Sequence, residues 1–129
     1  MIIPPLISVI DDDASFRIAA ESLLRSHGYT VHPFASAAEF LRSPQLDDTS
    51  CVIADVQMPA MSGIELQSFL RQQGRSVPFI FITAFPEEAV RIHALSDGAI
   101  GFLAKPFDSL TLIGCVKAAL GARRDSTGA

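Results

Sequence analysis

The chain has 129 residues, of which 49% are hydrophobic and 19% charged, and its formal net charge is −4. This length and composition fit one folded domain with a buried core and exclude a disordered chain. The acidic balance argues against direct nucleic-acid binding, because contact with phosphates requires a basic surface.

Neither a membrane span nor a secretory signal is expected. No apolar run reaches membrane-spanning length, and the N-terminus lacks the basic segment of a signal peptide. Cys51 and Cys115 both lie in apolar runs, which is typical of buried thiols in a reducing compartment. We therefore expect a cytoplasmic protein.

Five short apolar runs predict five buried strands, at residues 6–10, 30–34, 51–55, 77–82 and 99–103. Helical patterns follow each of them. Capping side chains predict where four helices begin: Asp13, Ser36 with Glu39, Ser62 with Glu65, and Asp108. Pro86, Glu87 and Glu88 are typical of the first turn of the remaining helix. Glycines are expected near four helix ends: Gly28, Gly74, Gly98 and Gly121.

Alternating strands and helices predict an α/β fold with a single doubly wound sheet of five parallel strands and five helices. Residues 1–122 would form this domain, and residues 123–129 a polar tail or the start of a linker. The strand that ends at Asp55 is expected to be central. In such a sheet, ligands bind at the edge where the strands have their carboxyl ends.

Polar side chains gather at this expected edge. The residues at or just beyond strand ends are Asp11, Asp12, Asp55, Thr83 and Lys105. Neighbouring carboxylates repel one another, and a divalent cation relieves that repulsion. Oxygen ligands of this kind suit Mg²⁺, while a lysine can pair with phosphate and a threonine can donate a hydrogen bond. The set predicts phosphoryl transfer, in which positioning and charge neutralisation do most of the catalysis.

The roles within this set can be divided by position. Asp55 is expected to be the phosphoacceptor because it comes from the central strand, and a carboxylate can act as a nucleophile. Asp12 is expected to bind the metal directly, Asp11 through water, and Gln57 through its backbone carbonyl. Asp13 is expected only to cap a helix.

At this point the chain resembles a response-regulator receiver domain, the phosphoacceptor module of bacterial two-component signalling. The resemblance extends from Leu6 to Leu120 and is greatest to the nitrogen-fixation regulator type. Four motifs carry it in order: the acidic pair 11–12, Asp-Val-Gln-Met-Pro-Ala-Met-Ser-Gly at 55–63, Ile-Thr-Ala at 82–84, and Lys-Pro-Phe at 105–107. One such motif is weak, but all four in this order are highly specific.

The resemblance implies a flavodoxin-like fold, a histidine kinase that donates phosphoryl to Asp55, and only self-directed chemistry rather than turnover of a substrate. It also implies a switch in which Thr83 turns towards the phosphoryl group while Phe102 swings inward. The changed face would comprise the fourth helix, fifth strand and fifth helix, where two copies could pair. The Lys105–Pro106 bond is expected to be cis, and a DNA-binding output domain often follows such a receiver.

Two residues depart from the family pattern. Phe102 stands where tyrosine is frequent, and Phe85 is bulky and apolar where polar residues are frequent. Phe85 is expected at the mouth of the site, where its ring could exclude the water that hydrolyses an aspartyl phosphate. The Gln57 amide could act in the opposite sense by positioning that water.

Two other functions compete with this one. A phosphatase of the haloacid-dehalogenase type would use Asp11 as nucleophile and Asp13 as acid, but only Asp108 offers the acid expected after the lysine. A receiver used only as a docking surface would usually lack an acid or the lysine, and here all are present.

Overall fold

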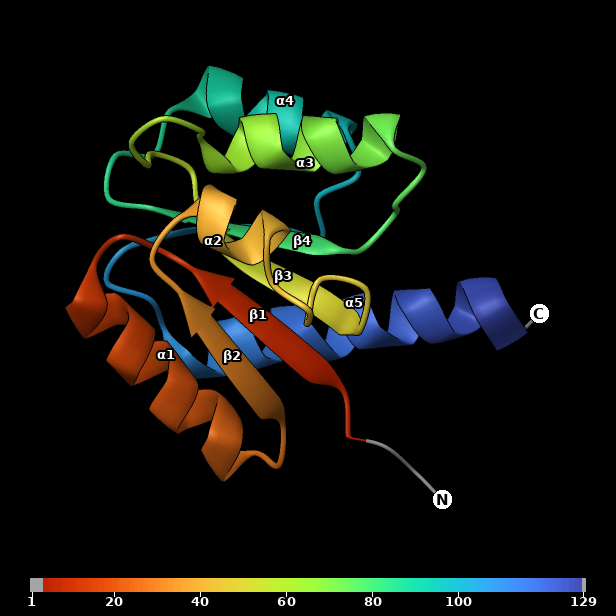
Figure 1. The fold of residues 1–129 in the computed structure, drawn as a ribbon. Coiled ribbons are helices and arrows are strands. Elements are labelled where there is room, and N and C mark those ends of the chain that lie inside the picture. Colours follow the sequence, from red (N-terminus) through yellow and green to blue (C-terminus); the bar gives the residue numbers. More distant parts are fainter. Residues whose placement is uncertain (1–3, 129) are drawn as a thin grey trace.

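Five parallel strands lie side by side in the order β2-β1-β3-β4-β5 in the computed structural model (Figure 1). The structure describes residues 4–128, with the side chains of residues 4–121. The strands are β1 Leu6–Ile10, β2 Thr30–Phe34, β3 Thr49–Asp55, β4 Phe79–Thr83 and β5 Gly101–Ala104. The predicted parallel sheet is confirmed, and β3 is its central strand.

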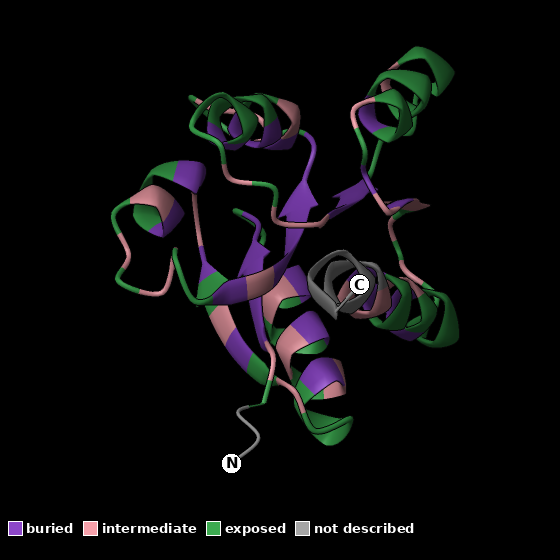
Figure 2. Cartoon of the chain, turned by 90° about the vertical axis from the view of Figure 1, so that its right-hand side faces the viewer, coloured by how far each residue is buried: buried purple, intermediate pink, exposed green. Residues whose placement is uncertain are grey.

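Helices cover both faces of the sheet (Figure 2). One face carries α1 Ala14–Ser26 and α5 Ser109–Gly128, and the other carries α2 Ala37–Leu41, α3 Gly63–Gln72 and α4 Glu88–Ser96. Each face has its own cluster of buried apolar side chains. Strands that are buried on both faces are largely apolar, as β1 and β4 illustrate: all five residues of each are buried, and Ser8 and Thr83 are their polar members.

The helix starts follow the predicted caps closely. Asp13, Ser36 and Ser62 accept hydrogen bonds from the first turns of α1, α2 and α3, and Asp108 accepts from the backbone N–H of Thr111. The reciprocal bond of a capping box is complete in α3. In α2 the Glu39 side chain accepts the N–H of Ala35 instead of the N–H of the N-cap residue Ser36.

Four predicted element starts are wrong. β3 begins at Thr49 rather than residue 51, since Thr49 pairs with Leu6 and its hydroxyl hydrogen-bonds Ser8 at 2.8 Å. α4 begins at Glu88, so Pro86 precedes the helix, and Glu87 is an N-cap that makes no side-chain capping bond. Strands β4 and β5 each begin two residues later than predicted.

The end predicted for the last helix is also wrong. α5 does not stop at Gly121 but continues to Gly128. One glycine costs a helix only about 1 kcal/mol, and the alanine and two arginines that follow are strong helix formers. Among the described residues, no helix combines the length and apolar character needed to cross a bilayer.

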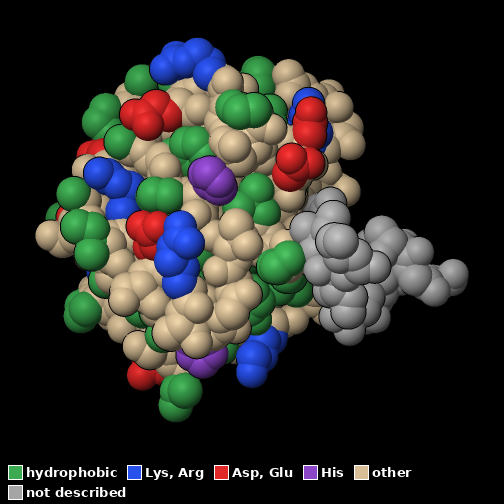
Figure 3. Space-filling model, turned by 60° about the horizontal axis from the view of Figure 1, so that its bottom comes forward, with side chains coloured by type: hydrophobic (Ala, Val, Ile, Leu, Met, Phe, Trp, Pro, Cys, Tyr) green, Lys and Arg blue, Asp and Glu red, His purple; other side chains and the backbone are tan. Residues whose placement is uncertain are grey.

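The surface has mixed charge. On the face shown in Figure 3, acidic and basic side chains are interspersed among hydrophobic ones, with no basic patch.

Candidate functional site

The strand register brings the polar residues of four strand ends together. Ile10 pairs with Ala54, so Asp11 follows β1 beside Asp55 at the end of β3. Asp55 pairs with Ile82, one residue before Thr83. Thr83 pairs with Ala104, one residue before Lys105. A parallel sheet thus delivers residues from distant parts of the sequence to one edge.

Three carboxylates form the centre of the site. Asp11, Asp12 and Asp55 each offer an oxygen, and these oxygens all lie within 4.8 Å of one another. Asp11 is fully buried and Asp55 is 6% exposed, whereas Asp12 is exposed. The predicted acidic cluster is therefore assembled, with one member open to solvent.

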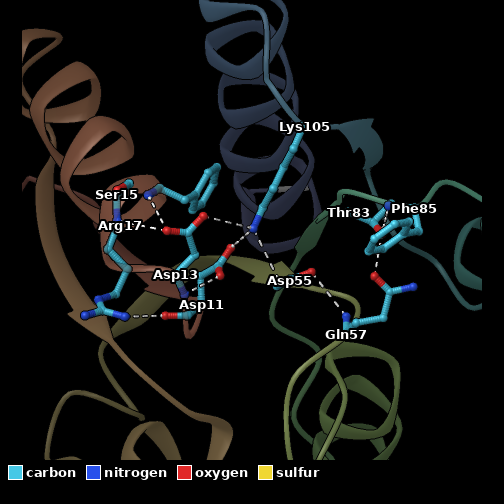
Figure 4. A network of polar contacts seen from close by, with 10 residues as sticks. Asp11, Asp13, Ser15, Arg17, Asp55, Gln57, Thr83, Phe85 and Lys105 are labelled. Carbon is cyan, nitrogen blue, oxygen red and sulfur yellow. Dashed lines mark hydrogen bonds and ion pairs between the residues drawn. The ribbon is translucent and has the colours of Figure 1, made fainter.

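Lys105 lies among these acids (Figure 4). Its Nζ is 2.9 Å from Asp11 Oδ2, 3.4 Å from Asp55 Oδ2 and 3.9 Å from Asp13 Oδ2. Burial alone would lower the pKa of Lys105, but the ion pairs with Asp11 and Asp55 outweigh it and raise that pKa. Lys105 is therefore a permanent cation at neutral pH. Asp13 caps α1 as predicted and adds a longer ion pair.

Both carboxylate oxygens of Asp11 face a positively polarised partner. Its Oδ1 accepts the N–H of Asp13 at 2.9 Å, and its Oδ2 forms an ion pair with Lys105 Nζ at 2.9 Å. Burial raises the pKa of Asp11, and the negative charge of Asp55 acts in the same direction, against the lowering effect of Lys105 and the Asp13 N–H. A buried carboxylate whose oxygen lies within 4.8 Å of oxygens from two more carboxylates fits a hard divalent cation.

The loop after β3 holds Asp55 tightly. The N–H of Gln57 donates to Asp55 Oδ1 at 3.1 Å, and Gly63 donates to the carbonyl of Val56 at 3.1 Å. A Cβ at Gly63 would lie only 2.4 Å from the carbonyl oxygen of Asp55, so no other residue fits there without a backbone shift. Glycine thus allows α3 to start directly beside the end of β3.

Thr83, Gln57 and Phe85 form the other side of the site (Figure 4). The buried hydroxyl of Thr83 donates to Gln57 Oε1 at 2.9 Å and accepts the N–H of Phe85 at 3.0 Å. The Phe85 side chain is 70% exposed, so it is not packed into the α4 interface. Thr83 therefore faces the Gln57 side chain rather than the carboxylates.

Two predicted features lie near the site without joining the acidic cluster. Phe102 is half-buried in β5 and packs against the core cluster on the α2–α3–α4 face. The Lys105–Pro106 bond is cis, as expected.

Sequence reasoning missed two residues of α1. The first is Phe16, whose ring centroid lies 5.0 Å from Lys105 Nζ. Arg17 was not singled out, yet its Nη1 donates to the backbone carbonyl of Asp11 at 2.7 Å. The available signal was position, because the first turn of α1 follows the acidic loop directly.

The family model of the response regulator receiver domain matches residues 7–117. The chain belongs to the response-regulator receiver family. Proteins of this family are signalling proteins rather than typical catalysts, and response regulators receive phosphoryl from histidine kinases.

The proteins similar to this chain include FixJ, a regulator of the nitrogen-fixation type that the sequence resembles. The chain is 38% identical over 115 residues to response regulator protein TodT of Pseudomonas putida, covering 89% of this chain and 51% of that protein. It is also 38% identical over 115 residues to transcriptional regulatory protein FixJ of Azorhizobium caulinodans. That match covers 89% of this chain and 54% of FixJ. The solved structure of response regulator StyR superposes with a TM-score of 0.89 at 36% identity, covering 98% of this chain and 64% of that one. The receiver therefore spans about half the length of the curated relatives it matches.

The phosphatase alternative is not supported by these relatives. The geometry gives the physical reason. A nucleophile needs an accessible oxygen, but Asp11 is fully buried, with one oxygen bound to the N–H of Asp13 and the other facing Lys105.

Proposed function

We propose that this receiver is a phosphorylation switch in which Asp55 accepts a phosphoryl group from the phosphohistidine of a histidine kinase. The observation that carries the proposal is the position of Asp55. It ends the central strand, lies within 4.8 Å of two other carboxylates and contacts Lys105 at 3.4 Å. Asp11 has the same neighbours but no accessible oxygen.

In the transfer, an Asp55 carboxylate oxygen attacks phosphorus while the bond from phosphorus to the imidazole nitrogen breaks. The electron pair of that bond stays on the imidazole, which takes up a proton from solvent. Lys105 pairs with the added phosphoryl oxygens and neutralises their charge. The N–H of Gln57 orients the Asp55 carboxylate for attack.

The chemistry of the donors supports Mg²⁺ at the acidic cluster. We assign Asp12 and Asp55 as direct ligands, Asp11 as a ligand through water, and the Gln57 backbone carbonyl as a further ligand. When bound, the ion would neutralise the carboxylates and the incoming phosphoryl oxygens. The feature of this chain that favours a cation there is the close approach of three carboxylates, whose oxygens lie within 4.8 Å of one another.

The proposed output is a change of the α4–β5–α5 face. Thr83 would leave Gln57 and turn to the phosphoryl oxygen, and Phe102 would move inward from its half-buried position. Exposed apolar side chains on α4 and α5 support pairing of two copies through this face: Ile92 (56% exposed), Leu95 (37%) and Leu110 (81%). Sedimentation with and without beryllofluoride, a phosphoryl mimic, tests the pairing, and Ile92→Glu is expected to abolish it.

The whole protein's role is a further part of the proposal. The matched region is only 54% of transcriptional regulatory protein FixJ, so a DNA-binding output domain would suit the whole protein. Such a regulator would act in the cytoplasm. Attack of water on the aspartyl phosphate would release inorganic phosphate and regenerate Asp55. The switch would therefore reset itself.

The test is Mg²⁺-dependent phosphorylation by acetyl phosphate, followed by intact mass measurement. Wild-type protein is expected to gain one phosphoryl group, which EDTA prevents. Asp55→Asn is expected to gain none, while Asp13→Asn, which removes only the longest Lys105 ion pair, still gains one. Full phosphorylation of Asp55→Asn, or equal yield in EDTA, would refute the proposal.

A further inference from the structure

The ammonium of Lys105 lies over an aromatic ring of α1 as well as among carboxylates. Its Nζ is 5.0 Å from the centroid of the Phe16 ring. We propose that Phe16 is a positioning residue, whose ring face holds the Lys105 ammonium at the acidic cluster. The inference deepens the proposed function and rests on it for its kinetic consequence.

The Phe16 ring is itself held by Phe107, two residues after Lys105 in the chain. The Phe107 ring meets it edge to face, with centroids 5.5 Å apart and an interplanar angle of 81°. Phe16 is 6% exposed within the α1–α5 core cluster, and the side chain of Lys105 is 16% exposed. A cation over a fixed ring, shielded from water, is the geometry in which this attraction is strongest.

The ring supplies what the carboxylates cannot. Three carboxylates attract Lys105 Nζ, each from a different position. The distances to it are 2.9 Å from Asp11, 3.4 Å from Asp55 and 3.9 Å from Asp13. A long lysine side chain has rotamer freedom that charge attraction alone does not remove. The Phe16 ring contacts the Lys105 ammonium from the α1 side. The position of the ammonium therefore depends on the ring as well as on the carboxylates.

The Phe16 ring should matter most when a cation binds the carboxylates. A divalent cation among the carboxylates would compete with Lys105 for Asp11 and Asp55 and would repel its charge. The attraction to Phe16 does not use those carboxylates, so it persists. We therefore expect Phe16 to contribute more to the position of Lys105 in Mg²⁺ than in its absence.

Lysine side-chain NMR tests the contact without any phosphorylation. The chain has two lysines, Lys105 and the exposed Lys117 of α5, so Lys117 is an internal reference. Protons above an aromatic ring resonate upfield, and the ε-methylene protons of Lys105 are expected upfield of those of Lys117. Phe16→Leu is expected to move them to the Lys117 position, with the larger change in Mg²⁺, and Phe16→Tyr to retain the upfield shift. Coincident lysine signals in the wild type, or signals unmoved by Phe16→Leu, would overturn the inference.

Phosphorylation rates at saturating Mg²⁺ test the consequence. Phe16→Leu is expected to slow reaction with acetyl phosphate about three- to tenfold, with Phe16→Tyr restoring the rate. The packing control is Leu24→Ala, which damages the same core cluster two turns along α1 and should leave the Lys105 signal and the rate unchanged. An unchanged rate in Phe16→Leu, or equal slowing by Leu24→Ala, means that Phe16 does not position Lys105. If wild-type protein takes no phosphoryl group, the proposed function fails, and the NMR signals still decide whether Phe16 holds Lys105.

Discussion

The hydroxyl of Thr83 donates its only proton to Gln57 Oε1, 2.9 Å away. Its oxygen also accepts the N–H of Phe85 at 3.0 Å. In the proposed switch, Thr83 instead donates to a phosphoryl oxygen on Asp55. The bond to Gln57 must then break, so Gln57 holds Thr83 in the unphosphorylated arrangement.

Gln57→Ala is expected to favour the activated arrangement, because it removes the acceptor that Thr83 must leave. A neutral hydrogen bond contributes about 0.5–1.5 kcal/mol, so the variant should bind beryllofluoride about two- to tenfold more tightly in Mg²⁺. Amide NMR titration measures this affinity. In a Thr83→Ala background the same change should have no effect, and a gain of equal size there would contradict the role given to the hydrogen bond.

Phe85 is expected to lengthen the life of the aspartyl phosphate. Its ring is 70% exposed and lies near Thr83 and Gln57 (Figure 4), where we expect it to obstruct the approach of water to Asp55. Phe85→Ala and Phe85→Glu should both lose phosphate faster than wild type, and Phe85→Glu fastest because a carboxylate can position water. Neither should change the free energy of unfolding by more than about 0.5 kcal/mol, since the ring is exposed. Hydrolysis no faster than wild type in both variants would show that the ring does not shield the site.

Gly63→Ala is expected to destabilise the fold and disturb Asp55. The new Cβ would lie 2.4 Å from the Asp55 carbonyl oxygen and 3.2 Å from the Phe81 ring. Overpacking of this kind costs about 1–3 kcal/mol, measurable by urea unfolding. Gly114→Ala in α5 is the matched control, because a Cβ there meets nothing within 4 Å and should add up to about 1 kcal/mol of helix stability. Equal effects of the two substitutions would contradict the close approach at Gly63.

Ala60→Gly is expected to stabilise the loop after β3. Ala60 has φ of +69°, a left-handed conformation that costs an L-residue about 1–2 kcal/mol and costs glycine little. Part of that cost is offset by the greater freedom of glycine in the unfolded chain, so we expect a gain of about 0.5–1 kcal/mol. Ala19→Gly on the exposed side of α1 should instead lose about 1 kcal/mol. A loss of stability in both variants would show that Ala60 is unstrained.

Local sequence patterns predict most of the fold because the apolar runs and the helix-capping residues indicate the same elements. Apolar runs identify strands buried on both faces, and side chains such as Asp13 and Ser62 cap helices in the structure as in the sequence. Two helix boundaries differ from those that the sequence predicts. Gly121 was read as a helix end, although the residues after it favour helix, and Pro86 was read as a first turn, although α4 begins two residues later.

The acidic cluster was predictable for a topological reason, whereas its supports were not. Parallel strands bring Asp11, Asp55 and Lys105 to one edge whatever their side-chain rotamers. The hydrogen bond from Thr83 to Gln57 and the ring of Phe16 beneath Lys105 depend on register and rotamers, which the sequence pattern does not contain.

The identity of the phosphorylated residue is measured most directly by trapping the acyl phosphate. Borohydride reduces an aspartyl phosphate to homoserine, and peptide mass spectrometry then locates that homoserine in the chain. After reaction with a phosphorylated kinase or acetyl phosphate in Mg²⁺, we predict homoserine at position 55 and unmodified aspartate at positions 11, 12 and 13. Homoserine at position 11, 12 or 13, with Asp55 intact, would contradict the assignment of Asp55 as the phosphoacceptor.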